Sequence, residues 1–397
     1  MRISARAEGI RPFYVMEMAK AAAELGRQAA NSDSPMVFLN IGEPDFTAPP
    51  LVCEAAERAI RGGKTQYTPA VGLPALRERI SDWYTQRFGL AVAPQRILVT
   101  AGASAALQLA CLALIESGDR ILLPDPSYPC NQQFIHAADG TAVLVPSGAA
   151  QRFQLDEASL RQAWDADRKR TRGVLLASPS NPTGTSIHPA ELRRIHALVQ
   201  NRGGITLVDE IYLGLGYEPE YGHTALAIDE QIISINSFSK YFNMTGWRLG
   251  WMVVPAQLVP VIEKIAQHLF ICPSTIAQHA ALACFEPASI QEYERRRGEF
   301  KARRDYLVPA LGALGLDVPV MPDGAFYAWA DCSRAAARLG VRDSWEFAFA
   351  VMENAHIAIT PGRDFGIAET ANFVRFSSAS SMADLHTAVE RLRQLLT

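Results

Sequence analysis

Short apolar runs rich in β-branched residues alternate with helical patterns from Arg96 onward. The runs are apolar on both faces, as strands buried inside a parallel sheet must be. Helical patterns fill several of the gaps, most clearly at Ala103–Glu116 and Pro189–Gln200. This alternation predicts an α/β fold with a mostly parallel seven-stranded sheet flanked by helices. The predicted strands are Arg96–Thr100, Arg120–Leu123, Thr141–Val145, Gly173–Ala177, Ile205–Val208, Ile232–Asn236 and Gly250–Val254.

A different pattern after Leu258 predicts a smaller α/β domain at the C-terminal end. The chain has 397 residues, more than one ordinary domain needs. A helix is expected over residues 10–30 and a strand at Pro35–Ile41, with this segment folding back onto the small domain. We divide the chain into an N-terminal arm that is part of the small domain (1–47), a large domain (48–287) and the rest of the small domain (288–397). In the C-terminal part, helices are expected at Leu258–Phe270, Thr275–Cys284, Ala288–Leu314 and Asp343–Asn354 and from Met382, with strands at Ala325–Ala330 and Asn372–Ser377.

Composition and charge favour a reduced, cytoplasmic protein without a nucleic-acid or membrane partner. The formal net charge is −3, and 49% of residues are hydrophobic. No basic patch indicates a nucleic-acid or membrane partner, and the arginine-rich stretch from Glu294 to Arg304 is interpreted as a solvated helix face. No apolar run suits a signal peptide or a membrane span. The six cysteines are scattered without metal-ligand spacing, so we expect a reduced protein and no metal site.

Four polar segments lie at the carboxyl ends of predicted strands, where open α/β sheets bind ligands. In the first, Val99–Leu107, small residues lead from a strand into a helix whose N-terminus suits a phosphate. It contains neither G-x-G-x-x-G nor a P-loop motif, and a tight strand-to-helix turn is the more common explanation of such a segment.

The second and third segments place Asn181 and Asp209 after apolar strands. Two prolines and Gly184 restrict the turn around Asn181, although an asparagine in a turn is usually structural. A carboxylate at Asp209 is costly to bury without a cationic partner, but a solvent-facing acid or a helix cap is the simpler alternative.

The fourth segment runs from Ser237 to Gly250 and contains Lys240 and Arg248. Most lysines are solvated surface residues. Lys240 is flanked by hydroxyl residues and lies between two predicted strands, where a surface role is less natural.

Together these residues suit pyridoxal 5′-phosphate, which needs a lysine for its aldehyde, an acid beside its pyridine nitrogen and donors for its phosphate. The segments SNPTG at 180–184, DEIY at 209–212, SFSK at 237–240 and GWRLG at 246–250 are jointly specific. In order and content they resemble the aspartate aminotransferase family, the class I/II aminotransferases of fold type I. The resemblance extends from GEPDF at 42–46 to Arg375, nearly the whole chain.

The resemblance implies a role for each matching residue. Lys240 would bond the cofactor aldehyde and act in catalysis together with Asp209 and Tyr212, and Asp209 would pair with the pyridine nitrogen. Asn181 and Tyr212 would contact the phenolic oxygen and Tyr128 would stack on the ring. The phosphate would be held by Ala103, Ser104, Ser237, Ser239 and Arg248, and by Tyr67 from the partner subunit of a homodimer with shared active sites. The substrate would contact Arg375, through its α-carboxylate, and Gly42, Asn181, Phe13 and Tyr14.

The implied activity is ping-pong transfer of an amino group from an L-amino acid to a 2-oxo acid, with a neutral donor favoured. Aspartate-specific relatives place a cation near the second carboxylate of their substrate. A lysine used by one bacterial subgroup is replaced by Ser104 here, and we find no arginine in Ile271–Ile276. The segment Arg11–Tyr14 adds aromatic bulk, although Phe13 and Tyr14 could instead only pack the helix onto the small domain.

Two alternatives share these residues. A C–S β-lyase of the same fold would use the same lysine, acid and arginine. A non-catalytic pyridoxal-phosphate-binding regulator would usually carry an additional DNA-binding segment, for which the sequence shows no basic helix.

Overall fold

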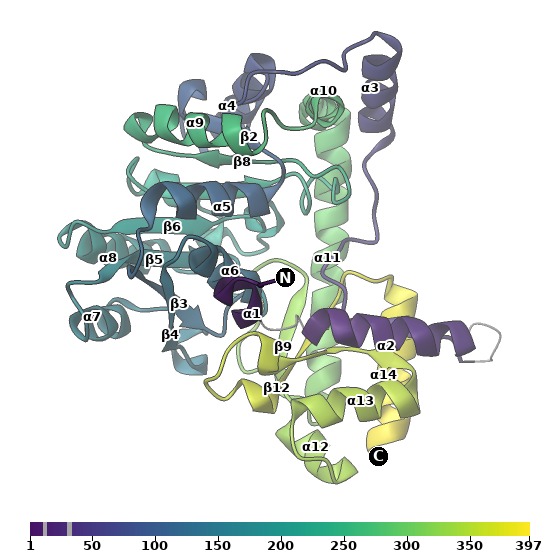
Figure 1. Cartoon of the computed structure of the whole chain (residues 1–397). Helices are drawn as coiled ribbons and strands as arrows, with labels where there is room; N and C mark the ends of the chain where they lie inside the picture. The colour runs from purple at the N-terminus through teal and green to yellow at the C-terminus, as the bar shows by residue number, and fades with distance from the viewer. Residues whose placement is uncertain (11–13, 30–33) are drawn as a thin grey trace.

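A seven-stranded sheet forms the centre of the chain, described by a computed structural model over residues 1–10, 14–29 and 34–397 (Figure 1). The strand order is β2-β8-β7-β6-β5-β3-β4, and only β8 runs antiparallel to its neighbours. Each strand overlaps one of the predicted runs, so the predicted mostly parallel sheet is confirmed. The strands are β2 (Ile97–Thr100), β3 (Arg120–Asp125), β4 (Thr141–Pro146), β5 (Thr171–Ala177), β6 (Ile205–Asp209), β7 (Ile233–Ser237) and β8 (Gly250–Val253).

Helices cover both faces of this sheet because successive strand residues point to opposite sides. Leu175 packs in one core cluster, whereas its neighbours Val174 and Leu176 pack in another. The first cluster includes side chains of α5 (Ala103–Leu114), α6 (Pro129–Ala137) and α9 (Val259–Leu269). The second includes side chains of α7 (Glu157–Asp165) and α8 (Pro189–Gln200).

A third cluster packs α3 (Pro50–Arg61), α4 (Pro74–Phe88) and α10 (Thr275–Ala281) against the sheet edge. Aromatic rings dominate it, including Trp83 and Trp251 with ring centroids 5.8 Å apart. Both α3 and α4 begin with proline, whose fixed φ suits the first helical position. That proline marks two helix starts that the apolar pattern alone did not predict.

A second group of elements, here called the second body, is built on α11 (Pro287–Ala313), which stands upright just right of the centre in Figure 1. A three-stranded antiparallel sheet has the order β11-β12-β9. The remaining elements are β9 (Tyr327–Asp331), β11 (Thr360–Pro361), β12 (Phe373–Ser377), α12 (Ser333–Leu339), α13 (Ser344–Ala355) and α14 (Met382–Leu396).

The N-terminal segment begins with α1 (Ala5–Gly9), and its later part packs on this second body. That part contains α2 (Tyr14–Ala29) and β1 (Val37–Phe38), and β1 pairs in parallel with β10 (Ile357–Ala358). Met18 and Ala22 of α2 are buried in the same cluster as Phe347 of α13. The division into 1–47, 48–287 and 288–397 stays an interpretation.

The arginine-rich stretch of α11 is not simply a solvated face, so that interpretation is wrong in part. Arg295 is exposed and pairs with Glu292 one turn earlier, but Arg303 and Arg304 are each only 5% exposed. Arg303 contacts both carboxylate oxygens of Asp45, at 2.8 and 2.9 Å. Burial is tolerated here because the guanidinium groups have acidic partners contributed by distant segments.

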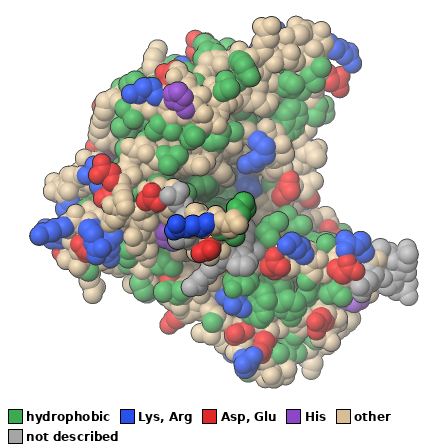
Figure 2. All heavy atoms as spheres, in the orientation of Figure 1, with side chains coloured by type: hydrophobic (Ala, Val, Ile, Leu, Met, Phe, Trp, Pro, Cys, Tyr) green, Lys and Arg blue, Asp and Glu red, His purple; other side chains and the backbone are tan. Residues whose placement is uncertain are grey.

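Basic and acidic side chains are interspersed on the face that Figure 2 shows. Among the described residues, no helix has the length and apolar character required to cross a membrane.

Candidate active site

A cavity of about 510 Å³ lies where the carboxyl ends of the parallel strands meet the second body (Figure 2). This volume is in the range typical of small-molecule sites. Among its lining residues are ten of the eleven expected cofactor residues, all except Tyr67: Lys240, Asp209, Asn181, Tyr212, Tyr128, Ala103, Ser104, Ser237, Ser239 and Arg248. The four polar segments predicted at strand ends therefore converge on one site.

Lys240 follows β7 and extends its amine into this cavity. Its Nζ donates a hydrogen bond to the carbonyl oxygen of Gly42 at 2.5 Å. Removal from water disfavours the ammonium form and lowers the pKa of Lys240 to about 8. A larger fraction of this amine is therefore neutral near pH 7 than for a lysine in water, as a nucleophile requires.

Asp209 ends β6 and is buried, with 7% of its surface exposed. Its Oδ1 accepts a hydrogen bond from the backbone N–H of Ile211 at 3.1 Å. Burial raises the pKa of Asp209 to about 6, while that hydrogen bond and the nearby charge of Lys240 oppose the shift. A buried acid of this kind is suited to a cationic ligand group.

Hydroxyl and amide donors form a second part of the cavity. The Ser237 Oγ accepts a hydrogen bond from the Ser239 backbone N–H at 3.0 Å. Both serines line the cavity together with Ala103 and Ser104 at the N-terminus of α5. Gly102 precedes α5 with φ +85°, and a Cβ there would lie 2.8 Å from the Arg248 guanidinium. Only glycine therefore allows the helix start and the arginine to approach so closely, and together they present positive charge to the cavity.

Arg375 of β12 is 3% exposed and supplies a buried cation. Its guanidinium donates to the Asn181 Oδ1 at 2.9 Å and the Asn40 carbonyl at 2.7 Å. It also contacts the Thr360 hydroxyl at 3.3 Å, so none of these three acceptors carries a charge. A buried arginine with neutral partners is suited to a carboxylate ligand.

Tyr327 was not anticipated as a site residue, because a buried aromatic in a strand resembles core packing. It lies on β9, and its hydroxyl is 2.7 Å from that of Tyr212. The Arg375 guanidinium lies 4.5 Å from the centre of its ring. A Cβ at Gly42 would collide with the Tyr327 hydroxyl, which explains the glycine at that position.

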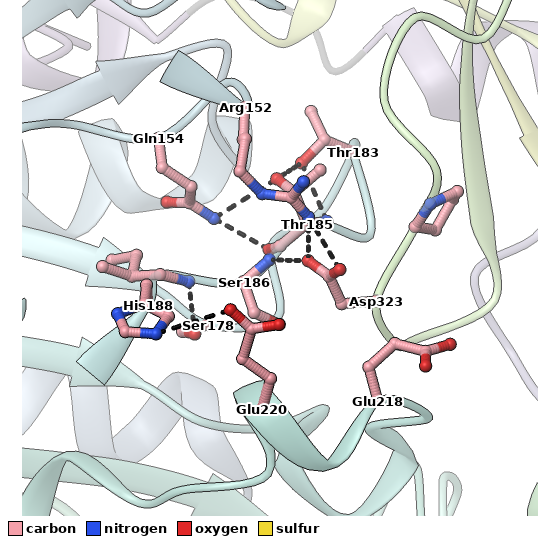
Figure 3. Close-up of polar contacts among 12 residues, drawn as sticks. Arg152, Gln154, Ser178, Thr183, Thr185, Ser186, His188, Glu218, Glu220 and Asp323 are labelled. Atoms are coloured by element: carbon pink, nitrogen blue, oxygen red, sulfur yellow. Dashed lines mark hydrogen bonds and ion pairs between the residues drawn. The ribbon is translucent and has the colours of Figure 1, made fainter. Parts of the chain in front are cut away.

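A polar network holds the turn 178–187, which includes Asn181, and Figure 3 shows its members Arg152, Gln154 and Asp323. Asp323 accepts from Arg152 at 2.7 Å and from the Ser186 backbone N–H at 2.7 Å. Gln154 donates to the Thr185 carbonyl at 2.8 Å. Asp323 precedes β9, so one buried carboxylate links the Asn181 turn to the strand of Tyr327.

Of the expected site residues that the structure describes, Tyr67 and Tyr14 do not line the cavity of this chain. Tyr67 is 79% exposed in the loop between α3 and α4. Tyr14 packs instead against Trp345, with ring centroids 5.5 Å apart, as its alternative packing role predicts. Phe13 lies outside the described residues.

The rest of the cavity wall consists of residues that we did not predict from the sequence. They are the polar residues Asn40 and Glu43 and a set of apolar residues. Residues of α2 have a helical pattern that is equally typical of core packing, so their position beside the cavity had no distinct signal. The apolar lining residues not anticipated are Val15, Met16, Ala19, Ile41, Leu107, Ala177, Pro179 and Ile211.

Comparisons with known proteins identify the family. The sequence profile described as aminotransferase class I and II matches residues 34–392. The chain is 36% identical to valine–pyruvate aminotransferase of Mycobacterium tuberculosis, over 98% of this chain and 97% of that protein. It is 33% identical to aspartate aminotransferase of Geobacillus stearothermophilus, over 100% and 99%.

Solved structures agree with this result. An aminotransferase from M. tuberculosis superposes with a TM-score of 0.93 at 36% identity, covering 100% of this chain and 99% of that one. Aspartate aminotransferase from Thermus thermophilus with maleate gives 0.91 at 32% identity, covering 100% of both chains. The resemblance and the fold type I architecture inferred from sequence are therefore confirmed. The chain belongs to the class I and II aminotransferases.

Proposed function

We propose that this aminotransferase moves the amino group of a neutral L-amino acid to a 2-oxo acid, with pyridoxal 5′-phosphate bound in the cavity. The observation that carries the proposal is the presence of Lys240, Asp209 and Arg375 in one cavity. A lysine of lowered pKa, a buried acid without a charged hydrogen-bond partner and a buried arginine with neutral partners match the three needs of this chemistry.

The residues present fit the cofactor, on which enzymes of this family generally depend. Lys240 would hold it covalently, and Asp209 would keep the pyridine nitrogen protonated. Asn181 and Tyr212 would contact the phenolic oxygen, and Tyr128 would cover the ring. The phosphate would lie against Ala103, Ser104, Ser237, Ser239 and Arg248. When bound, the cofactor supplies an electron-withdrawing ring conjugated to the substrate Cα.

The chain's own residues would then orient the substrate and move its proton. Arg375 offers a planar pair of donors that matches an α-carboxylate. Fixing this carboxylate selects which bond at Cα faces the ring. The Lys240 amine would take the proton from Cα as general base and, as general acid, would deliver it to the aldehyde carbon of the cofactor. Release of the first oxo acid before the second one binds gives ping-pong kinetics.

The preference for a neutral donor is supported by the apolar wall and by one relative. Val15, Met16, Ala19, Ile41 and Leu107 line the cavity. The position at which we looked for a bacterial lysine holds the uncharged Ser104. A relative of 36% identity is named for valine and pyruvate, although others are named for aspartate.

The test is a comparison of kcat/KM for aspartate, alanine, valine, leucine, methionine and phenylalanine, with pyruvate or 2-oxoglutarate as acceptor. At least one neutral donor should equal or exceed aspartate, because an uncompensated second carboxylate loses roughly a hundredfold. An advantage of about a hundredfold for aspartate would contradict the preference. Pyruvate and ammonia formed from a cysteine conjugate without any acceptor would favour the β-lyase alternative.

We further propose a homodimer in which Tyr67 serves the partner's site. Exposed apolar side chains accompany Tyr67: Ile60 is 54% and Ile271 51% exposed. The Thr275 hydroxyl donates to the Gln66 carbonyl at 2.7 Å, so the Tyr67 loop is attached to α10 beside Ile271. Exposed apolar surface of this kind marks an interaction site.

Sedimentation of the holoenzyme should therefore give a dimer at assay concentrations, with an interface of more than about 2,000 Å². A Tyr67→Phe variant should keep the dimer but retain the cofactor less tightly, because only the hydroxyl is lost. Full activity of a dilute monomer would contradict the shared-site proposal.

A further inference from the structure

We propose that Asp364 is a positioning residue that holds α2 against the active-site cavity and thereby sets KM for donors with long apolar side chains. The predicted effect on KM rests on the proposed function, whereas the role of Asp364 in holding α2 does not depend on it. Asp364 itself is not among the residues that line the cavity. It lies in η8 (Gly362–Asp364), directly after β11.

The Asp364 carboxylate accepts two backbone hydrogen bonds at the start of α2. Its Oδ1 accepts from the Tyr14 N–H at 3.2 Å and its Oδ2 from the Val15 N–H at 2.5 Å. The first amides of a helix have no acceptor within the helix. An ionised carboxylate at this end also interacts favourably with the helix dipole. Asp364 therefore caps α2 although it lies 350 positions after Tyr14 in the sequence.

The capped end of α2 is a wall of the cavity. Val15, Met16 and Ala19 line the cavity from the first turns of the helix. Met18 and Ala22 lie on another face and are buried in the core of the second body. One face of α2 therefore packs in the core while another face lines the cavity, and a displacement of the first turn would move the cavity wall.

A stack of side chains supports the same end of α2. The Arg363 guanidinium lies 4.3 Å from the ring centre of Tyr14 and 4.7 Å from that of Trp345. Tyr14 thus fills a site on the second body, outside the cavity. Its position lets Val15 and Met16 face the substrate.

The segment after Asp364 reaches the other walls. The Phe365 ring packs 5.2 Å from the Arg375 guanidinium, and the Phe365 carbonyl accepts from the Ser127 N–H at 2.7 Å. Asp125 of β3 accepts from the Ala368 N–H at 3.0 Å. The segment 362–368 therefore fixes α2 relative to the carboxylate-binding arginine and to the loop of Tyr128.

This arrangement predicts a selective effect on substrates. A valine or leucine side chain extends towards an apolar wall, whereas an alanine methyl group ends near Cα. Loosening α2 should weaken ground-state contacts with the longer side chain and leave the reacting atoms in place. The change should appear in KM and not in kcat.

The experiment compares Asp364→Ala and Asp364→Asn with the wild-type holoenzyme. Asp156→Ala is the matched control, because Asp156 caps α7 through the Ser159 N–H at 2.8 Å and no residue of α7 lines the cavity. Hydrogen exchange of the α2 amides is measured without substrate, and kcat and KM are measured for valine, leucine and alanine.

For Asp364→Ala we expect roughly fivefold faster exchange in α2, the usual size of a lost helix cap. The KM for valine and leucine should rise by a similar factor, with kcat and the KM for alanine changed less than about twofold. Asp364→Asn keeps one acceptor oxygen, so its exchange rate and KM values should lie between those of the wild type and those of Asp364→Ala. Asp156→Ala should loosen α7 and leave α2 and all three KM values unchanged.

Unchanged exchange in α2 of Asp364→Ala would overturn the capping role. Faster exchange with an equal change of KM for alanine and leucine would overturn the role in selectivity. If the wild-type holoenzyme transaminated no neutral donor, including methionine and phenylalanine, the proposed function would fail, while the exchange measurement would still decide whether Asp364 holds α2.

Discussion

Replacing Lys240 with alanine should abolish transamination and the absorbance of lysine-bound cofactor. The amine is expected to perform two tasks, bonding the cofactor aldehyde and moving the proton at Cα, and no other residue is expected to replace both. Its pKa of about 8, lowered by removal from water, makes the neutral amine accessible near neutral pH. Absorbance spectra and transamination rates of the two purified proteins, each with excess pyridoxal phosphate, provide the measurement.

A lysine outside the cavity provides the control. Lys301 on α11 pairs with Asp305 at 2.8 Å and does not line the cavity, so Lys301→Ala should keep both spectrum and rate. Borohydride reduction of the wild-type holoenzyme followed by peptide mapping should place the label on Lys240. A label on any other lysine would overturn the assignment of the whole site.

The sheet was predictable because buried parallel strands are apolar on both faces and end at polar segments. The same rule located Asn181, Asp209 and Lys240, since the carboxyl ends of parallel strands meet at one edge. Helices α3 and α4 were harder to predict, because their clearest signal was a single proline at each start. Their apolar faces pack on aromatic residues that come from distant parts of the chain.

No comparable rule predicts which residues of the second body line the site. Tyr327 begins the short strand β9 and Asn40 follows β1, and buried side chains at such positions resemble ordinary core. Val15 and Met16 line the cavity from the start of α2, which binds Asp364, a residue separated from α2 by most of the sequence. Arg303 and Arg304 resembled surface charges because their acidic partners are also distant in sequence.

Replacing Asp209 with alanine or asparagine should lower kcat by roughly a thousandfold while the protein stays folded. In a site from which water is excluded, a preorganised charge that faces the reacting atoms commonly raises the rate by roughly this factor. Burial raises the pKa of Asp209 to about 6 although the nearby charge of Lys240 opposes the shift, so keeping this carboxylate ionised in the site is unfavourable. A protonated ring nitrogen would offset that cost, because opposite charges in a buried site favour each other's ionised forms.

The neighbouring Glu210 makes a sharp control for this prediction. It is also buried, and burial raises its pKa to about 7, but its carboxylate binds the Thr224 hydroxyl at 2.8 Å and the Ala225 N–H at 2.6 Å instead of lining the cavity. Glu210→Gln therefore removes a buried acid one residue away without touching the ring, and its kcat should stay within about tenfold of wild type. Single-turnover rates with a saturating donor separate the chemical step from cofactor loss. If Asp209→Asn lost less than about tenfold, or no more than Glu210→Gln, another residue would have to face the ring nitrogen, and the charge-pairing role of Asp209 would be wrong.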